Sequence, residues 1–173
     1  MVKLLAFDTA AGACSAALWA DGRILAQESA EMARGHAERL MPMIASVMDR
    51  AGLAFGDLDA YAVTVGPGAF TGLRVGLAAA RGLALAGDRP VLGVGTLEAL
   101  AAAVPEAERR DRRILAALDS KRDDVFFQLF TPDLTPVGAP EVGTVDEAAA
   151  ALGAGPAAPA IIVGDGARLL RGA

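Results

Sequence analysis

The 173-residue sequence contains one cysteine and one histidine, and this scarcity excludes several kinds of site. A single cysteine forms no intrachain disulfide and supplies no cysteine-based metal site. A zinc protease needs at least two imidazoles in its usual ligand sets, whereas His36 stands alone. His36 begins a predicted helix, where a surface or capping role fits better than catalysis, and nothing near it resembles a nucleophile elbow. The sequence therefore excludes a cysteine-based metal site and gives catalytic chemistry little support, so we name no catalytic residue.

Positive charge and long apolar runs are also scarce. The chain has 16 Lys and Arg against 21 Asp and Glu, a net charge of −5, whereas a protein that binds RNA by itself usually presents a basic face. The densest basic stretch, residues 109–113, is interrupted by Asp111 and fits a solvated linker. No apolar run approaches the length of a membrane span, and Asp8 interrupts the only stretch that could begin a signal peptide. We therefore expect a cytoplasmic protein with no membrane partner and no independent contact with RNA.

The order of strands and helices predicts an α/β fold in two halves. Hydrophobic residues make up 54% of the chain but aromatic residues only 5%, and much of the rest is alanine, which favours closely packed helices. A charged stretch without periodicity, residues 105–113, sets the expected boundary between an N-terminal half, 1–107, and a C-terminal half, 108–173. Both halves open with a strand, a turn that contains an acidic residue and a hydroxyl, and a second strand.

The spacing of hydrophobic residues predicts the secondary structure of each segment. In the first half it predicts strands over 2–9, 14–20, 23–29, 60–65 and 90–95, and helices over 36–51, 70–86 and 96–103. In the second half it predicts strands over 114–118, 125–131, 137–141 and 160–163, a helix over 145–152 and a loop over 155–159.

Two of these helices carry more apolar surface than one core requires. The first, 36–51, has a wide apolar arc, and the second, 70–86, has large apolar residues pointing in nearly every direction. Within the second helix, Gly72, Gly76 and Ala80 recur every four residues and form a smooth ridge on which another backbone could lie close. Either a partner supplies one wall around this helix, or the helix is sandwiched within its own domain. On the first interpretation the partner interface contains Leu40, Met41, Ile44, Met48, Phe70, Leu73, Arg74, Gly76, Leu77, Ala80 and Arg81.

Polar residues at the strand ends are weak candidates for a phosphate site. Asp8 and Thr9 end the first strand, and Asp119 with Ser120 ends the first strand of the second half. Such a pair can hold a metal-bound water and a phosphate, or it can simply cap its own turn. The glycine-rich segment 66–72 precedes a helix, a location suited to anions, yet it is neither a Walker loop nor a dinucleotide fingerprint. A tight turn in which glycines let two backbones pack is at least as good an interpretation.

Several segments, taken together, resemble the TsaB (YeaZ) family. These are Phe7-Asp8-Thr9, residues 14–19 (CSAALW), His36 with Leu40-Met41-Pro42, residues 66–76 (GPGAFTGLRVG), residues 93–97 (GVGTL) and residues 117–122 (ALDSKR). The resemblance implies an actin-like, Hsp70-like ATPase fold (ASKHA, ribonuclease H-like) made of two related halves. Relatives usually continue for several more elements, so the second half is expected to be truncated or naturally shortened.

The resemblance also implies a function. Members of the family pair with a paralogue, TsaD, which carries the catalytic metal and transfers threonylcarbamoyl to adenosine 37 of tRNA (t6A37). A small ATPase, TsaE, joins the complex, and TsaB self-associates through the same helical face. The chain is thus expected to be a non-catalytic scaffold that docks and activates TsaD, contacts tRNA only through the complex and forms a homodimer in isolation.

The resemblance bears on cofactors as well. The two metal-binding histidines of the paralogue correspond here to Thr96 and Leu100, and neither side chain replaces an imidazole. We therefore expect this chain alone to bind no metal and no cofactor. A nucleotide bound at a junction between subunits of the complex stays an open alternative. The alternative is an enzyme of the same fold, either an ASKHA ATPase or a glycoprotease-like metallohydrolase, which would hold a nucleotide or metal at Asp8 and Asp119.

Overall fold

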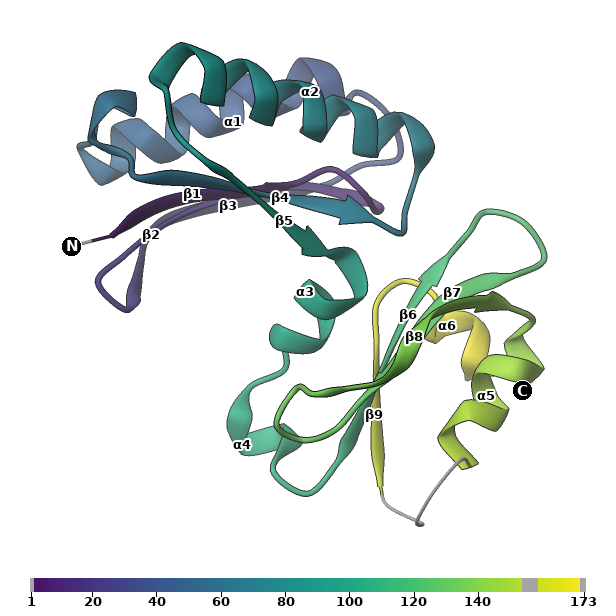
Figure 1. Ribbon diagram of the computed structural model, residues 1–173. Helices are drawn as coiled ribbons and strands as arrows, with labels where there is room; N and C mark the ends of the chain where they lie inside the picture. The colour runs from purple at the N-terminus through teal and green to yellow at the C-terminus, as the bar shows by residue number, and fades with distance from the viewer. Residues whose placement is uncertain (1, 154–158, 172–173) are drawn as a thin grey trace. The chain divides into compact units, whose positions relative to one another are not determined.

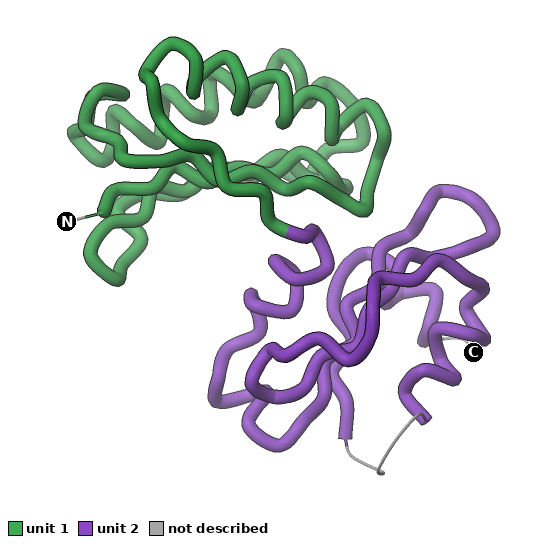
Figure 2. Tube along the Cα trace, in the orientation of Figure 1, with its two compact units in different colours: residues 1–94 green, residues 95–173 purple. Residues whose placement is uncertain are grey.

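The computed structural model describes residues 2–153 and 159–171, and the chain divides into unit 1, residues 1–94, and unit 2, residues 95–173 (Figure 2). The boundary expected after residue 107 lies inside unit 2. The structural boundary comes earlier because the helix that begins at Thr96 packs on the strands of unit 2. Residues 155–158 of the predicted loop lie outside the described residues.

Unit 1 is a five-stranded sheet of order β3-β2-β1-β4-β5 with two long helices on one face (Figure 1). Its elements are β1 (Lys3–Asp8), β2 (Ala13–Ala20), β3 (Arg23–Glu31), α1 (His36–Ala51), the short 3-10 helix η1 (Phe55–Asp57), β4 (Ala60–Gly66), α2 (Phe70–Gly87) and β5 (Val91–Gly95). The first three strands are antiparallel, whereas β4 runs parallel to β1 after the crossover through α1.

Local sequence explains this arrangement. Asp21 and Gly22 both take positive φ, which is the geometry of the tight hairpin that an Asp-Gly pair favours between β2 and β3. Alternate side chains of the strands, such as Leu5 and Phe7 of β1, point to the helical face and are buried there. Gly52, with φ 67°, ends α1 in the left-handed conformation that glycine adopts without strain.

Unit 2 contains a four-stranded sheet of order β8-β7-β6-β9. Its elements are α3 (Thr96–Ala102), α4 (Glu106–Arg109), β6 (Arg113–Asp119), β7 (Val125–Phe130), β8 (Pro136–Gly143), α5 (Val145–Gly153), β9 (Ala160–Val163) and α6 (Ala167–Leu170). In β6, Leu115 and Ala117 pack with α5 and α6, while α3 contacts β6 and β7. Because both of its faces are covered, residues 114–118 are all buried.

Both units share one topology. Each has three antiparallel strands, then a helix, then a strand parallel to the first, then another helix, and the strand orders correspond. This confirms the two related halves predicted from the sequence. Within the described residues, no helix is both long and apolar enough to cross a lipid bilayer.

Candidate functional site

The first predicted phosphate site, the turn between β1 and β2, is occupied by contacts within its own chain. The Thr64 hydroxyl and the Ala10 N–H (2.9 Å) both donate to Oδ1 of Asp8. The Thr9 hydroxyl, which is buried, donates to the carbonyl oxygen of Gly72 at 2.7 Å. Asp8 and Thr9 therefore cap this turn and fasten it to β4 and α2.

The glycines of segment 66–76 let α2 lie directly against this turn. The Ala69 N–H donates to the carbonyl oxygen of Ala10 at 2.7 Å. A Cβ atom at Gly68 or Gly72 would overlap the backbone of Ala10 or Thr9, and one at Gly76 would lie 2.7 Å from the Thr9 hydroxyl. The backbone that lies close to the glycine ridge is thus the chain's own.

The ATPase fold expected from the resemblance implies a bound nucleotide and its metal ion. The β1–β2 turn does not fit such a ligand. No residue from 9 to 12 takes a positive φ, so the turn lacks the alternation of right- and left-handed residues that makes N–H groups converge on an anion. The carboxylate of Asp8 already accepts two hydrogen bonds. Nothing in this geometry leaves a cradle for phosphate.

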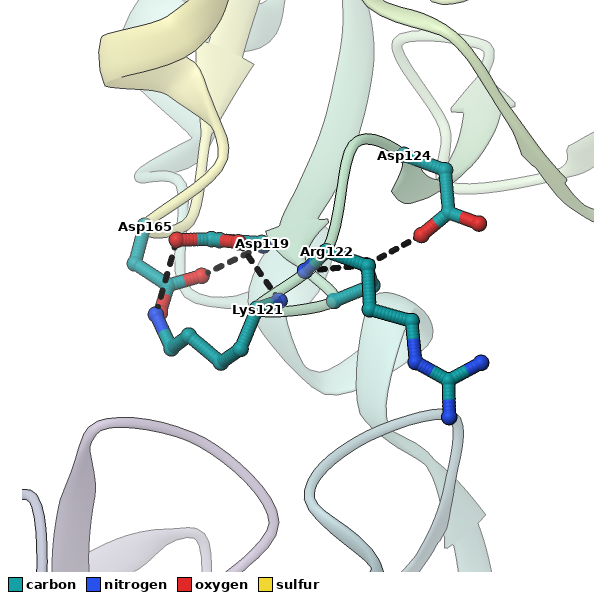
Figure 3. A network of polar contacts seen from close by, with 6 residues as sticks. Asp119, Lys121, Arg122, Asp124 and Asp165 are labelled. Carbon is teal, nitrogen blue, oxygen red and sulfur yellow. Dashed lines mark hydrogen bonds and ion pairs between the residues drawn. The ribbon is translucent and has the colours of Figure 1, made fainter.

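The second predicted site, at the end of β6, contains a cation supplied by the chain itself (Figure 3). The Lys121 ammonium bonds Oδ2 of Asp119 at 2.9 Å and Oδ2 of Asp165 at 3.1 Å. The Asp119 N–H donates to Oδ1 of Asp165 at 2.9 Å, and the Lys121 N–H donates to Oδ1 of Asp119 at 2.7 Å. Asp119, Lys121 and Asp165, named here the Lys121 triad, join the two turns β6–β7 and β9–α6.

In the Lys121 triad a single ammonium lies between two carboxylates. Burial alone would raise the pKa of Asp119, but the hydrogen bonds and charge of Lys121 outweigh it and lower that pKa. The hydrogen bond to Asp119 is the main cause of a raised pKa at Lys121. The backbone N–H of Arg122 is also used, since it donates to the Ser120 hydroxyl, while its guanidinium points away from the triad (Figure 3). This loop does not fit a metal-bound phosphate either.

A metal site and a reactive cysteine thiol are two other routes to catalysis. The described residues contain no group of three or more His, Cys, Asp or Glu side chains placed to hold a metal ion. Cys14 is buried, and burial followed by the nearby Asp8 carboxylate raises the pKa of its thiol, so the nucleophilic thiolate is disfavoured. Thr96 and Leu100 lie one helical turn apart on α3, and Thr96 is buried.

The predicted partner interface needs correction at five positions. Leu40, Ile44 and Met48 are buried in the core of unit 1, as are Gly76 and Ala80. The apolar arc of α1 packs on its own sheet, and the smooth ridge of α2 faces inward because a close backbone approach is needed at the β1–β2 turn. These five residues are therefore not surface residues of this chain.

The other six residues of the predicted interface are exposed or half-buried. Leu73 and Leu77 are half-buried, whereas Met41, Arg74 and Arg81 are exposed. Phe70 is 68% exposed, and the guanidinium of Arg74 lies 3.6 Å from the centroid of its ring.

Leu85, which is 87% exposed, was missing from the predicted interface. It could have been found, because it follows Arg81 by four residues and so shares its side of the helix. Phe70, Arg74, Arg81 and Leu85 form one narrow strip along α2, named here the α2 outer strip.

Comparisons with known proteins decide the family. A family model described as TsaD, tRNA N6-adenosine threonylcarbamoyltransferase, matches residues 23–157. The tRNA threonylcarbamoyladenosine biosynthesis protein TsaB of Escherichia coli is 38% identical over 134 residues, which is 76% of this chain and 56% of that protein. The protein of the same name from Haemophilus influenzae is 40% identical over 127 residues, 73% of this chain and 52% of that protein. The chain belongs to the TsaB (YeaZ) family.

Solved structures agree with this assignment. YeaZ from Pseudomonas aeruginosa is 39% identical with a TM-score of 0.75, covering 82% of this chain and 67% of that one. Component A of (R)-2-hydroxyglutaryl-CoA dehydratase from Acidaminococcus fermentans, 14% identical with a TM-score of 0.53 over 83% of this chain and 48% of that one, shares the fold alone. The predicted actin-like ATPase (ASKHA) fold is thereby confirmed. The chain spans about half the length of the curated TsaB relatives that it matches.

Proposed function

We propose that this chain is a non-catalytic scaffold subunit of the machinery that makes t6A37, and that it docks and activates a TsaD paralogue through the α2 outer strip. The observation that carries the proposal is an exposed strip of apolar and arginine side chains on α2. It occurs in a chain whose relatives are named tRNA threonylcarbamoyladenosine biosynthesis proteins. On this proposal tRNA is contacted only through the complex, and TsaE joins the larger assembly.

The composition of the α2 outer strip suits a protein interface. Aromatic residues and arginine are enriched at the energetic centres of interfaces, whereas isolated exposed apolar residues are ordinary on any surface. Phe70 and Leu85 stand at the two ends of the strip, and burying one such side chain contributes about 1.5–3 kcal/mol. The stacking of Arg74 on Phe70 holds the ring in place before binding and so reduces the entropy lost on docking.

The non-catalytic part of the proposal is supported by the two strand-end turns. The Asp8 carboxylate accepts hydrogen bonds from Thr64 and Ala10, and the Asp119 carboxylate accepts one from the Lys121 ammonium. An enzyme of this fold would need these carboxylates for a nucleotide-bound metal. Isothermal titration with Mg-ATP is therefore expected to give no saturable heat, and a stoichiometric binding curve would favour the ATPase alternative.

The direct experiment mixes the purified chain with a TsaD paralogue and measures mass by light scattering on a sizing column. The expected result is a one-to-one heterodimer that replaces a homodimer of the chain alone, since both assemblies would use the same strip. If both proteins are folded by circular dichroism and still elute separately, the proposal is wrong.

A further inference from the structure

In unit 2, strand β8 arches away from β7. Phe127 pairs with Glu141 and Leu129 pairs with Val137, so a single β7 residue, Gln128, lies opposite three residues of β8. The arch is held by the Gln128 side-chain amide, which donates to the carbonyl oxygen of Gly138 at 2.9 Å. Gly138 itself has φ 88°, a conformation that favours glycine.

The arch leaves a hollow of about 330 Å³ between β7, β8 and α5. This volume lies within the lower range of small-molecule sites. Phe127 and Leu129, both buried core residues, contribute to its lining, together with Ala151 of α5. Val137 and Val142 also line it and are 47% and 58% exposed. Among the described residues of unit 2, only Leu169 is another large apolar side chain with comparable exposure, so exposed apolar surface is concentrated here.

Two carboxylates, Glu141 and Glu147, complete the lining. Because Glu141 pairs with Phe127 across the sheet, it lies on the face that α5 covers. Glu147 is fixed by a reciprocal cap: its Oε2 accepts from the Thr144 N–H at 2.7 Å and from the Thr144 hydroxyl at 3.1 Å. Its Oε1 has no hydrogen-bond partner, and neither carboxylate has a cationic partner, among the described residues.

A hollow lined by both apolar side chains and two uncompensated carboxylates selects its ligand by chemistry. An anion or a phosphate ester would be repelled, and a neutral hydrocarbon would leave the carboxylates without a counter-charge. We propose that this hollow binds an aliphatic ammonium, with the alkyl chain along Phe127 and Leu129 and the ammonium between Glu141 and Glu147. This site belongs to unit 2 and does not depend on docking through α2.

The test is a titration of the full chain with n-pentylamine, followed by the methyl resonances of Val137 and Val142. Saturable shifts at these methyls are expected, and n-pentanol, which has the same apolar chain without charge, is expected to bind at least about tenfold more weakly. Glu141→Gln should weaken n-pentylamine binding by about threefold to fivefold, as for one exposed charge pair. Glu108→Gln, an exposed glutamate on α4 that does not line the hollow, is the matched control and should change nothing.

A second variant moves a carboxylate without removing its charge. A Cβ atom at Gly143 would lie 2.6 Å from Oε2 of Glu147, so Gly143→Ala should displace this carboxylate and weaken binding while the net charge stays the same. Equal binding of n-pentylamine and n-pentanol, or no response to Glu141→Gln in a folded variant, would overturn the proposal. A lysine-containing pentapeptide that competes with n-pentylamine would identify a partner's lysine as a source of the ammonium. Failure of that peptide beside a positive n-pentylamine titration would point to a free amine.

Discussion

Gly72 and Gly82 lie on the same helix, yet a methyl group added at these positions meets opposite surroundings. At Gly72 the new carbon would overlap the carbonyl oxygen of Thr9, whereas at Gly82 nothing lies within 4 Å. Gly72→Ala is therefore expected to destabilise the protein by at least about 2 kcal/mol, because the β1–β2 turn must move and the Thr9–Gly72 hydrogen bond weakens. Urea unfolding followed by circular dichroism measures the difference.

The matched change, Gly82→Ala, should stabilise the protein by about 0.5–1 kcal/mol, because alanine has the higher helix propensity and the site is open. If the two variants unfolded at the same urea concentration, close packing of α2 on the β1–β2 turn would not require glycine at position 72.

At the scale of single residues, the sequence predicted which residues matter at the strand ends but did not predict all of their contacts. Asp8, Thr9 and Asp119 were singled out from their positions at strand ends, and all three do hold strand-end turns. Lys121 could not be assigned, because its partner Asp165 lies far along the chain and only the parallel pairing of β6 with β9 brings it near. Spacing within one segment carries no information about such a contact.

The Lys121 triad acts between elements, since it ties the β6–β7 turn to the β9–α6 turn. Lys121→Met should lower the free energy of unfolding by at most about 1 kcal/mol at neutral pH, because the Lys121 side chain is 64% exposed and solvent screens the pair. Arg122→Met removes a neighbouring charge with no ion pair among the described residues and should have no measurable effect.

The loss should depend on pH in a defined direction. The pKa of Asp119 is lowered from 3.8, so its contribution is present above that value and disappears as pH falls through the folded-state pKa. The pKa of Lys121 is raised from 10.5, so its contribution is present below that value and disappears as pH rises through the folded-state pKa. Unfolding of Lys121→Met and the unchanged chain should therefore converge in strong acid, and a constant difference there would contradict the charge pairing.

Periodicity located the elements well but did not orient them. The helix predicted over 36–51 coincides with α1, and the strand predicted over 160–163 coincides with β9. The short helix α4 was missed because four residues carry no full period, and its Arg109 is held by the carbonyl oxygen of Pro132, a contact distant in sequence. The inward direction of the α2 ridge could have been predicted, since Arg74 and Arg81 share the side of the helix opposite Gly72, Gly76 and Ala80 and so indicate the face toward solvent.

At the scale of the whole molecule, the proposed docking surface and the core of unit 1 use different residues of the predicted interface. The five inward residues of the predicted interface belong to the stability of unit 1, and the α2 outer strip is left exposed. If the α2 outer strip docks the partner as proposed, docking and folding use different sides of the same helix. This separation means that a change in the strip should impair assembly without unfolding the protein.

The most direct test compares Phe70→Ser with Ile24→Ser in a light-scattering titration against the TsaD paralogue. Both residues are exposed apolar side chains of unit 1, 68% and 55% respectively, but only Phe70 belongs to the α2 outer strip. Phe70→Ser should weaken the complex by about tenfold to a hundredfold, the cost of losing one buried aromatic anchor, while Ile24→Ser stays within about twofold. Equal affinities for both folded variants, or a loss confined to Ile24→Ser, would contradict docking through α2.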